Sequence, residues 1–337
     1  MEDPRAGTNF RSGYAPTVPT RALFILDPLD RIAPDADSTY LMMLEALARG
    51  HGVHGAMIEA LSLHDDTALA CARPVGIERP GAPPTFVGAP VTSRLDDFDV
   101  VFQRKDPPFD ERYLISTWIL DRARGSTLIV NDPHGLRELN EKLAILAFPH
   151  LTPRTRLLRT RDELYAALDD FGGQMIVKPV FGFGGRAILK VRHDDPNLNA
   201  LLELATAEHT EWTVAQEFLP AAREGDKRIL LVDGAPIGAV LRVPAAGEGR
   251  SNFHVGGTAS QTMLDAHDRR ICEEVGPFLA SRGQFFVGLD VIGGKLTELN
   301  VTSPTGMQEV NQMSGLRGPE TSQARFWDGI DARLQQR

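Results

Sequence analysis

The stretch Phe286-Val-Gly-Leu-Asp290-Val-Ile-Gly-Gly-Lys-Leu-Thr-Glu298-Leu-Asn300-Val-Thr-Ser-Pro304 decides the fold of the C-terminal half of the chain. Two apolar runs flank a Gly-Gly pair, which is the pattern of a β-hairpin. Glu298 and Asn300 are two positions apart, so both side chains point to one face of the second strand. A two-residue turn would place Asp290 opposite Thr297, on the other face. We therefore predict a three-residue loop or a bulge at Gly293–Lys295 that aligns Asp290 with Glu298 and Asn300.

Three oxygen-bearing side chains on one face of otherwise apolar strands are typical of a magnesium site. Mg²⁺ takes a few carboxylates and completes its shell with phosphate oxygens and water. The alternative is a solvated polar face on an edge strand. Charges that interrupt core-like strands favour the metal site, with Asp290, Glu298 and Asn300 as its ligands.

A second motif, Phe181-Gly182-Phe183-Gly184-Gly185-Arg186, lies between the expected strands Gln174–Lys178 and Ala187–Val191. It is not a Walker A loop, because no Gly-Lys-Ser/Thr follows. It also fails the dinucleotide fingerprint, because a strand and not a helix comes next. The backbone N–H groups of such a hairpin can fold over phosphates. The alternative is a plain hairpin turn.

Charged residues surround these two motifs in the sequence. Lys142 falls in an expected helix, Leu136–Phe148, and Lys178 ends an apolar strand beside the glycine motif. Arg228 and Arg242 lie on adjacent expected strands and could stabilise charge on a transferred phosphoryl group or a tetrahedral intermediate. Taken singly, each of these side chains is more often a surface or structural charge.

The organisation of the chain changes near its middle. Strands alternate with helices over Ala22–His134, which predicts a doubly wound parallel sheet. Within it, Arg73–Pro90 is rich in Pro and Gly and predicts a loop with short strands. The second half mixes antiparallel hairpins with helices, an α+β pattern, and Pro244–Gln261 has the composition of a mobile loop. We expect residues 1–20 to form a disordered extension.

Composition excludes several classes of function. The chain has 337 residues and a net charge of -9, which argues against nucleic acid as a partner. No apolar run is long enough to span a membrane, and the N-terminus lacks the apolar core of a secretory signal. The two cysteines, Cys71 and Cys272, are expected to be reduced thiols, so we expect a cytoplasmic protein.

Considered together, the motifs resemble those of bacterial glutathione synthetase, an ATP-grasp ligase. The resemblance runs from Ala22 almost to the C-terminus, and the order and spacing of its stretches make it specific. These stretches are Arg104–Asp110, Leu139–Leu143, Val177–Gly185, Gly225–Arg228, Val287–Asp290 and Thr297–Thr305.

The resemblance implies an ATP-grasp fold, combining α/β and α+β parts. It implies an N-terminal α/β substrate-binding domain at 21–135 and an ATP-grasp domain at 136–337. That domain would divide into a lid at about 150–220 and a C-terminal grasp subdomain at about 221–337. It further implies Mg²⁺ or Mn²⁺ as the metal, ATP as co-substrate and a homotetramer.

The resemblance also assigns residues. The implied ATP-binding residues are Lys142, Lys178, Gly182, Gly184, Gly185, Gln216, Glu217, Phe218, Leu219 and Asp226. Asp290, Glu298 and Asn300 match the family's metal ligands, and Arg228 and Arg242 match its catalytic arginines. The implied substrate-binding residues are Arg104, Asn252, Thr302, Ser303 and Thr305. The sequence differs from the family pattern at Phe181, Arg186, Thr258-Ala259 and Gly306–Gln308.

The implied reaction joins γ-glutamylcysteine to glycine. The cysteinyl carboxylate takes the γ-phosphate of ATP, and the glycine amine then displaces phosphate from the acyl phosphate. The site must exclude water, because the acyl phosphate hydrolyses readily. Two alternatives remain open at this stage. One is a related ligase with a different peptide or amino-acid acceptor, and the other is a nucleotide-binding protein without ligase turnover.

Overall fold

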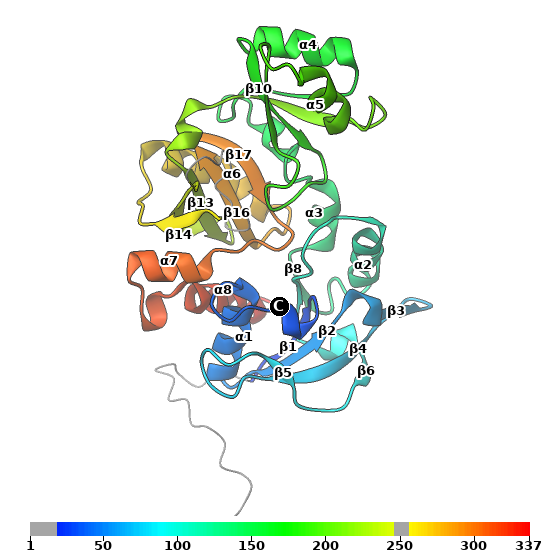
Figure 1. The fold of residues 1–337 in the computed structure, drawn as a ribbon. Helices are drawn as coiled ribbons and strands as arrows, with labels where there is room; N and C mark the ends of the chain where they lie inside the picture. The colour runs from blue at the N-terminus through cyan, green and yellow to red at the C-terminus, as the bar shows by residue number, and fades with distance from the viewer. Residues whose placement is uncertain (1–18, 246–255) are drawn as a thin grey trace, which may run out of the picture.

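The structure is a computed structural model, and it describes residues 19–245 and 256–337. The expected extension at residues 1–20 lies almost entirely outside these ranges, as do Asn252 and much of the Pro244–Gln261 loop. Figure 1 shows three sheets arranged along an elongated molecule. The N-terminal sheet is at one end, an antiparallel sheet formed by C-terminal strands is in the middle, and a small sheet carrying α4 and α5 is at the other end.

The N-terminal sheet has the strand order β3-β4-β2-β1-β7-β8. Its four parallel strands are β1 (Arg21–Ile25), β2 (Gly52–Ala56), β7 (Val100–Gln103) and β8 (Leu128–Val130). Parallel strands covered on both faces are apolar throughout, and β1 and β7 are buried almost completely. The predicted parallel core of this domain is confirmed.

The Pro- and Gly-rich segment departs from the prediction. The chain forms a ten-residue strand that reaches Gly76, although a loop was predicted from Arg73. This strand pairs antiparallel with β2, so the sheet as a whole is mixed. The alternation of buried and exposed residues from Ala68 to Ala72 is the signal of a half-buried strand. The antiparallel strands are β3 (Leu61–His64), β4 (Thr67–Gly76), β5 (Thr85–Phe86) and β6 (Val91–Arg94).

Helices α1 (Ser38–Ala48), α2 (Glu111–Asp121) and α3 (Pro133–Glu138) complete this half. Asp37 caps α1, because its side chain accepts a hydrogen bond from the Thr39 N–H at 2.7 Å. Ser38 instead accepts hydrogen bonds from the backbone N–H groups of Gly306 (3.1 Å) and Met307 (3.2 Å). This links the first helix to the C-terminal half.

The predicted helix Leu136–Phe148 is wrong, because the chain leaves the helix at Glu138 and forms only a short 3-10 turn at Ala144–Ala147. The cause is Asn140, whose Oδ1 accepts from the N–H groups of Lys142 (3.0 Å) and Leu143 (3.1 Å). A side chain that satisfies the backbone in this way replaces helical hydrogen bonds. Lys142 therefore lies in a turn.

The small sheet is antiparallel, with the order β11-β10-β12-β9. Its strands are β9 (Thr155–Leu158), β10 (Gln174–Pro179), β11 (Leu189–Arg192) and β12 (Thr213–Glu217). Helices α4 (Arg161–Asp170) and α5 (Leu198–Ala205) pack against it. Their buried side chains form a core cluster made only of residues between Leu164 and Ala215.

The middle sheet has the order β15-β14-β13-β16-β17, and all its pairings are antiparallel. Its strands are β13 (Asp226–Val232), β14 (Ala235–Val243), β15 (Thr258–Ser260), β16 (Phe286–Ile292) and β17 (Lys295–Asn300). Part of the predicted mobile loop is therefore a strand, because β15 pairs with β14. The remaining α-helices are α6 (Ala266–Ala280), α7 (Met307–Ser314) and α8 (Ser322–Gln335). Short 3-10 turns lie at Leu29–Arg31, Ile58–Ala60, Leu95–Asp97, Pro220–Arg223 and Gly318–Glu320.

The N-terminal and middle sheets share their cores. One cluster joins Phe24 and Phe102 of the first sheet to Phe286 of β16 and Trp327 of α8. The Trp327 indole N–H donates to the Met42 carbonyl at 2.8 Å. The buried Arg49 at the end of α1 forms ion pairs with residues of α8. The last helix of the chain is thus part of the N-terminal core.

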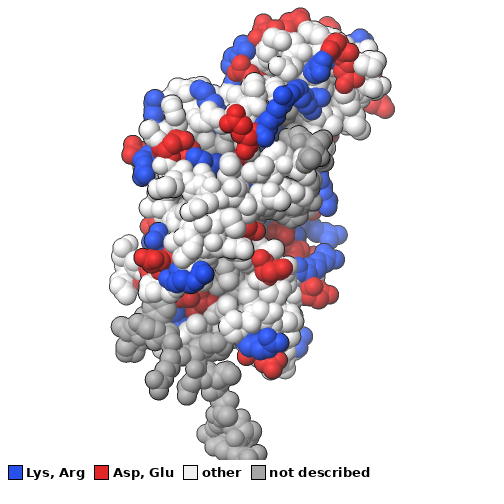
Figure 2. Space-filling model, turned by 60° about the vertical axis from the view of Figure 1, so that its left-hand side comes forward, with Lys and Arg blue, Asp and Glu red and all other residues white. Residues whose placement is uncertain are grey.

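Charges of both signs are interspersed over the face shown in Figure 2, with no extended field of one sign. Within the described ranges, no helix is long and apolar enough to cross a membrane.

Candidate active site

The hairpin β16–β17 brings its polar side chains to one face. Asp290 lies directly opposite Glu298, and Gly288 lies opposite Asn300. The turn itself has two residues, and the register shifts further along, between Asp290 and Val291. The predicted bulge is present, but it lies in the strands beside Thr297 and not at Gly293–Lys295. The predicted alignment of Asp290 with Glu298 is confirmed.

Asp290 is held between two arginines on the neighbouring strands. Its carboxylate accepts from Arg228 Nε at 2.5 Å and Arg228 Nη2 at 3.0 Å, and it lies 2.9 Å from Arg242 Nη2. Arg228 is the direct cross-strand partner of Asp290. Arg242 is paired in the same way with Asp226, and their side chains are hydrogen bonded. Strand register therefore sets the arrangement of all four side chains.

The pKa values of the two aspartates shift in opposite directions, although burial alone would raise both. Burial alone would raise the pKa of Asp290, but the charges of Arg228 and Arg242 outweigh it and hold that pKa below its usual range. Burial raises the pKa of Asp226 to about 6, and the Asp290 carboxylate adds to the effect, although Arg242 opposes it. Asp290 is thus ionised at neutral pH beside two fixed cations.

Glu298 faces a different partner. Its carboxylate lies 2.9 Å from Lys142 Nζ, and Lys142 also donates to the carbonyl oxygen of Gly182. The turn created by Asn140 therefore connects the second strand of the hairpin to the glycine motif. Asn300 donates from Nδ2 to the Gly288 carbonyl at 3.2 Å, which fixes its amide beside Glu298.

A cavity of about 390 Å³ lies in front of this face. Eight residues that the sequence pointed to line it together: Gly184, Arg228, Arg242, Glu298, Asn300, Thr302, Ser303 and Thr305. Other polar residues complete the wall and were not predicted: Arg31, Asp37, Asp106, Glu141 and Glu309. Asp106 and Glu141 lie within the stretches Arg104–Asp110 and Leu139–Leu143, whereas Arg31, Asp37 and Glu309 lie outside every quoted motif, so no spacing in the sequence indicated those three.

Arg104 does not line this cavity, although the family resemblance implied a substrate contact. It is buried, and its Nε donates to Thr39 Oγ1 at 3.1 Å while Nη2 donates to the Pro304 carbonyl at 3.0 Å. Burial lowers the pKa of this guanidinium. Arg104 therefore holds the Thr302–Thr305 segment against α1.

Lys178 lies where the small sheet meets the middle sheet. It is buried, and its Nζ donates to Gln216 Oε1 and to the Thr297 carbonyl, each at 3.2 Å. Burial lowers the pKa of this ammonium group, and the nearby Glu298 carboxylate opposes that effect. The contact joins β10 to the bulged part of β17, so the two expected nucleotide and metal regions touch.

The other expected hinge residues follow at the end of β12. Glu217 pairs with Arg154 at 3.0 Å on the surface. The Phe218 ring lies 3.5 Å from Lys190 Nζ, in a cation–π contact. Leu219 precedes the turn that leads to β13. The connection between the two sheets is therefore short.

The glycine motif is the predicted strand–loop–strand, because β10 and β11 pair up to Val177 and Leu189. Gly184 (φ 61°) and Gly185 (φ 76°) have left-handed backbone conformations that favour glycine. A Cβ on Gly182 would lie 2.5 Å from Pro179 Cγ. All three glycines are required by the loop shape, which leaves little room for substitution.

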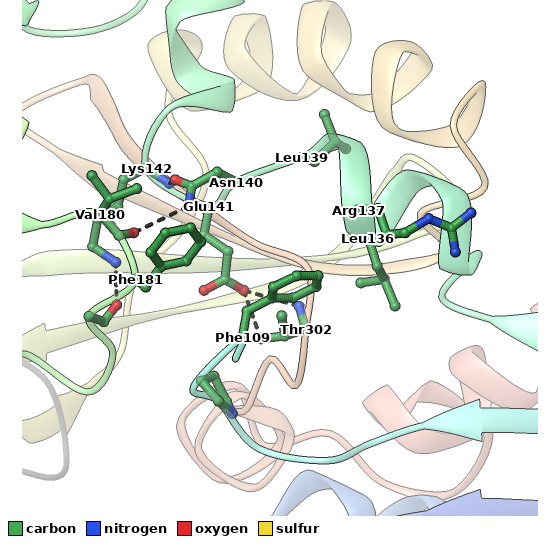
Figure 3. Close-up of a pocket in the computed structure, with 12 residues that line it drawn as sticks. Phe109, Leu136, Arg137, Leu139, Asn140, Glu141, Lys142, Val180, Phe181 and Thr302 are labelled. Carbon is green, nitrogen blue, oxygen red and sulfur yellow. Dashed lines mark hydrogen bonds between the residues drawn. The ribbon is translucent and has the colours of Figure 1, made fainter. Parts of the chain in front are cut away.

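A smaller pocket of about 60 Å³ adjoins the glycine motif (Figure 3). Figure 3 shows the Glu141 carboxylate directed at Thr302, with Phe109 and Phe181 in the same wall. Glu141 Oε1 accepts from the N–H groups of Val301 (2.9 Å) and Thr302 (3.0 Å) and from Thr302 Oγ1 (2.9 Å). Glu141 was not assigned a role from the sequence, and its position beside Lys142 was the available signal.

The side chains fit a magnesium ion that is shared with a nucleotide. In the described part of the chain, no three His, Cys, Asp or Glu side chains form a metal cage by themselves. Asp290, Glu298 and Asn300 nevertheless share one face, and two of them line the cavity. Mg²⁺ is commonly bound by one or two carboxylates together with substrate phosphates, which is the donor set offered here.

Comparison with known families identifies the chain. Residues 20–137 match the family described as "Prokaryotic glutathione synthetase, N-terminal domain". Residues 141–315 match "Prokaryotic glutathione synthetase, ATP-grasp domain". The chain belongs to the prokaryotic glutathione synthetase family. The resemblance, the ATP-grasp fold and the ligase class expected from the sequence are thereby confirmed.

Individual members of the family are similar over almost their whole length. The glutathione synthetase of Bradyrhizobium diazoefficiens is 42% identical over 306 residues, which cover 91% of this chain and 96% of that protein. The glutathione synthetase of Nitrosomonas europaea is 43% identical over 297 residues, covering 87% and 92%. Membership and this level of identity imply glutathione synthetase activity.

Solved structures support the fold at low sequence identity. D-cycloserine synthetase DcsG superposes with a TM-score of 0.63 at 14% identity, covering 93% of this chain and 99% of that one. The ATP-grasp ligase PsnB, in a complex that contains Mg and ADP, gives a TM-score of 0.60 at 15% identity, covering 94% and 99%. ATP-grasp enzymes use ATP with Mg²⁺, which agrees with the oxygen donors in this cavity.

Proposed function

We propose that this chain ligates γ-glutamylcysteine to glycine and forms glutathione, ADP and phosphate. The observation that carries the proposal is the wall shared by Arg228, Arg242, Glu298 and Asn300 in the 390 Å³ cavity. These groups stabilise transferred phosphoryl groups, and the chain that presents them is about 40% identical to glutathione synthetases.

The two sheets would divide the work of binding ATP. In this proposal residues of about 150–220 act as a lid, Lys178 contacts a phosphate of ATP, and the adenine is held by Gln216, Glu217, Phe218 and Leu219. Gly182, Gly184 and Gly185 would direct backbone N–H groups at the phosphates, with Lys142 beside them. Residues of about 221–337 would form the grasp subdomain, in which Asp226 and the arginine pairs lie next to the reacting groups.

Asp290, Glu298 and Asn300 would hold the metal ion, which we expect to be Mg²⁺ or Mn²⁺. When bound, the ion neutralises phosphate charge and lowers the barrier to phosphoryl transfer. Asp290 is suited to this role because Arg228 and Arg242 keep it ionised. Glu298 would exchange its contact with Lys142 for the ion, which would release Lys142 for a phosphate oxygen.

The chemistry then proceeds in two steps. A carboxylate oxygen of the cysteinyl residue attacks the γ-phosphorus of ATP, and ADP leaves. The glycine amine attacks the carbonyl carbon of the acyl phosphate, phosphate leaves, and the amine loses a proton. Arg228 and Arg242 would stabilise the negative charge that develops in both steps. Thr302, Ser303 and Thr305 line the same cavity and would orient the peptide, with Arg104 holding their segment in place.

The test is ADP release by the purified chain with γ-glutamylcysteine and a series of acceptor amino acids. Release that depends on glycine supports the proposal. ADP release only with another acceptor would support a related ligase. The reason to test this alternative is that the sequence differs from the family pattern at Thr258-Ala259 and Gly306–Gln308. No substrate-stimulated release would favour a nucleotide-binding protein without ligase turnover.

The proposal also includes a homotetramer in the cytoplasm, on the basis of family resemblance. Light scattering at micromolar concentration measures the assembly directly. A mass of four chains is expected, and a monomeric mass would contradict this part of the proposal.

A further inference from the structure

Glu309 is a polar residue of the cavity wall to which neither the sequence nor the proposed reaction assigns a role. It lies in the first turn of α7, and its side chain lines the cavity that contains Arg228, Arg242, Glu298 and Asn300. Its Oε2 is buried and has no hydrogen-bond partner. No lysine, arginine or histidine in the described ranges forms an ion pair with it.

Three cations of the site, Arg228, Arg242 and Lys142, are already paired with other acids. Arg228 is paired with Asp290, and Arg242 is paired with Asp226 and Asp290. Lys142 is paired with Glu298. A buried carboxylate oxygen without a partner is unfavourable, and burial raises the pKa of Glu309, although its own backbone N–H and the charges of Arg228 and Arg242 oppose the shift. The Glu309 carboxylate is therefore available to accept a hydrogen bond from a positively charged group in the cavity.

A metal ion is a poor match for this acceptor. The metal ion of the proposed reaction is assigned to Asp290, Glu298 and Asn300, and in the described ranges no hydrogen bond or ion pair joins Glu309 to these side chains. An ammonium group requires only one or two acceptors and forms strong charge-assisted hydrogen bonds with a carboxylate. Both substrates of the proposed reaction carry an ammonium group.

We propose that Glu309 binds a substrate ammonium group within this cavity and thereby selects the amino-acid substrate. The group belongs either to the γ-glutamyl residue of the donor, which has a free α-ammonium, or to the glycine acceptor. This inference rests on the proposed function. Its physical basis is the unpaired carboxylate oxygen of Glu309. A buried polar group left unpaired weakens the binding of any ligand that lacks a matching hydrogen-bond donor.

Steady-state kinetics of the full chain and of Glu309→Gln test the inference. Glutamine keeps the shape of the side chain and removes its charge. We expect the KM for one substrate, γ-glutamylcysteine or glycine, to rise about tenfold or more, with a smaller change in kcat and an unchanged melting temperature. Glu309→Asp should recover part of the loss. Glu320→Gln, the same change at an exposed glutamate, serves as the control.

A donor analogue identifies the source of the ammonium group. Glutaryl-cysteine is γ-glutamylcysteine without the α-ammonium. If Glu309 binds the donor, the unsubstituted chain should prefer γ-glutamylcysteine strongly, and Glu309→Gln should lose that preference. If it binds glycine, both chains should discriminate equally between the donors, and only the KM for glycine should rise.

Unchanged KM values for both substrates in Glu309→Gln would overturn the inference and leave the proposed function intact. Absence of glycine-dependent turnover in the unsubstituted chain would instead refute the proposed function, so the two failures are distinguishable. If Glu309→Gln melts earlier than the unsubstituted chain, the KM of Glu309→Asp decides. A normal KM for the aspartate variant with a raised KM for the glutamine variant supports binding, and equal KM values refute it.

Discussion

The two sheets that meet at the active site differ in the hydrophobic cores that stabilise them. The β13–β17 sheet shares core clusters with the N-terminal sheet, so the residues of the metal face are fixed to most of the molecule. The β9–β12 sheet has a core of its own, made only of residues between Leu164 and Ala215. Lys178 and Lys142 provide polar contacts across this junction. The difference supports the proposal that the metal ligands Asp290, Glu298 and Asn300 are preorganised and that the β9–β12 sheet acts as the lid over ATP.

The largest expected effect concerns Glu298 on the β13–β17 sheet. Replacing Glu298 with Ala removes a proposed metal ligand without disturbing a core, so turnover should fall roughly 10³-fold. The melting temperature should change little. The measurement is ADP release at saturating magnesium, with Glu273→Ala, an exposed glutamate of α6, as the control. Near-normal turnover in Glu298→Ala would remove the metal assignment and with it the functional meaning of the fixed face.

The next prediction tests whether the buried ion pairs around Asp290 stabilise the folded chain. Arg228→Met leaves the Asp290 carboxylate buried with one cation fewer, and breaking such a pair typically costs about 3–5 kcal/mol. Urea denaturation should show a loss of that size. Arg192→Met breaks a pair on the β9–β12 sheet that is exposed to solvent, and its urea midpoint should stay close to that of the unsubstituted chain. Equal losses in the two variants would mean that the fixed face is not stabilised by its buried pairs.

Unfolding free energies measured over a range of pH test the burial of the Asp226 carboxyl. Asp226 has a pKa of about 6 in the folded chain, above the value of about 3.9 expected when unfolded. The folded form thus binds more protons between these values. The stability contributed by this carboxyl is fully present below about pH 4 and is lost as pH rises through about 6. The difference in unfolding free energy between the unsubstituted chain and Asp226→Asn should fall by about 2–3 kcal/mol over that range. A difference independent of pH would contradict the assignment.

The smallest effect tests the junction. Lys178→Met removes the donor that joins the β9–β12 sheet to the Thr297 carbonyl, and it also removes a buried cation. Unfolding free energy should change by less than about 1 kcal/mol, because an apolar side chain of similar length offsets the loss. The Kd for ATP should rise about tenfold, which titration calorimetry measures. Lys190→Met, on the neighbouring strand, should leave it nearly unchanged, and a similar rise there would point to a general charge effect.

The sequence was sufficient for elements whose signals are local. The expected strand Gln174–Lys178 matches β10 (Gln174–Pro179) to within one residue. The hairpin of Asp290 and Glu298 was predicted because alternation and chemistry agreed. The helix over Leu136–Phe148 was mispredicted, since the Asn140 side chain competes with the helical backbone in a way that propensity does not reveal.

The candidate site was predictable only in part, and the division has a physical reason. Arg228, Arg242 and Glu298 lie on strands, where register turns sequence spacing into spatial position. Arg31 and Glu309 reach the same cavity from a turn and a helix, almost 280 residues apart in the chain. Their proximity depends on how whole sheets pack, which no local pattern encodes.

The docking of the last helix onto the first has a consequence for biosynthesis. Phe102 of the N-terminal sheet packs against Phe326 and Trp327 of α8, and Phe24 belongs to the same core cluster. During translation the N-terminal sheet is therefore synthesised long before α8. Its apolar surface stays exposed until almost the entire chain has emerged from the ribosome. Nascent chains of this protein should need chaperone protection for most of their translation, and premature stop codons just before α8 should yield aggregates.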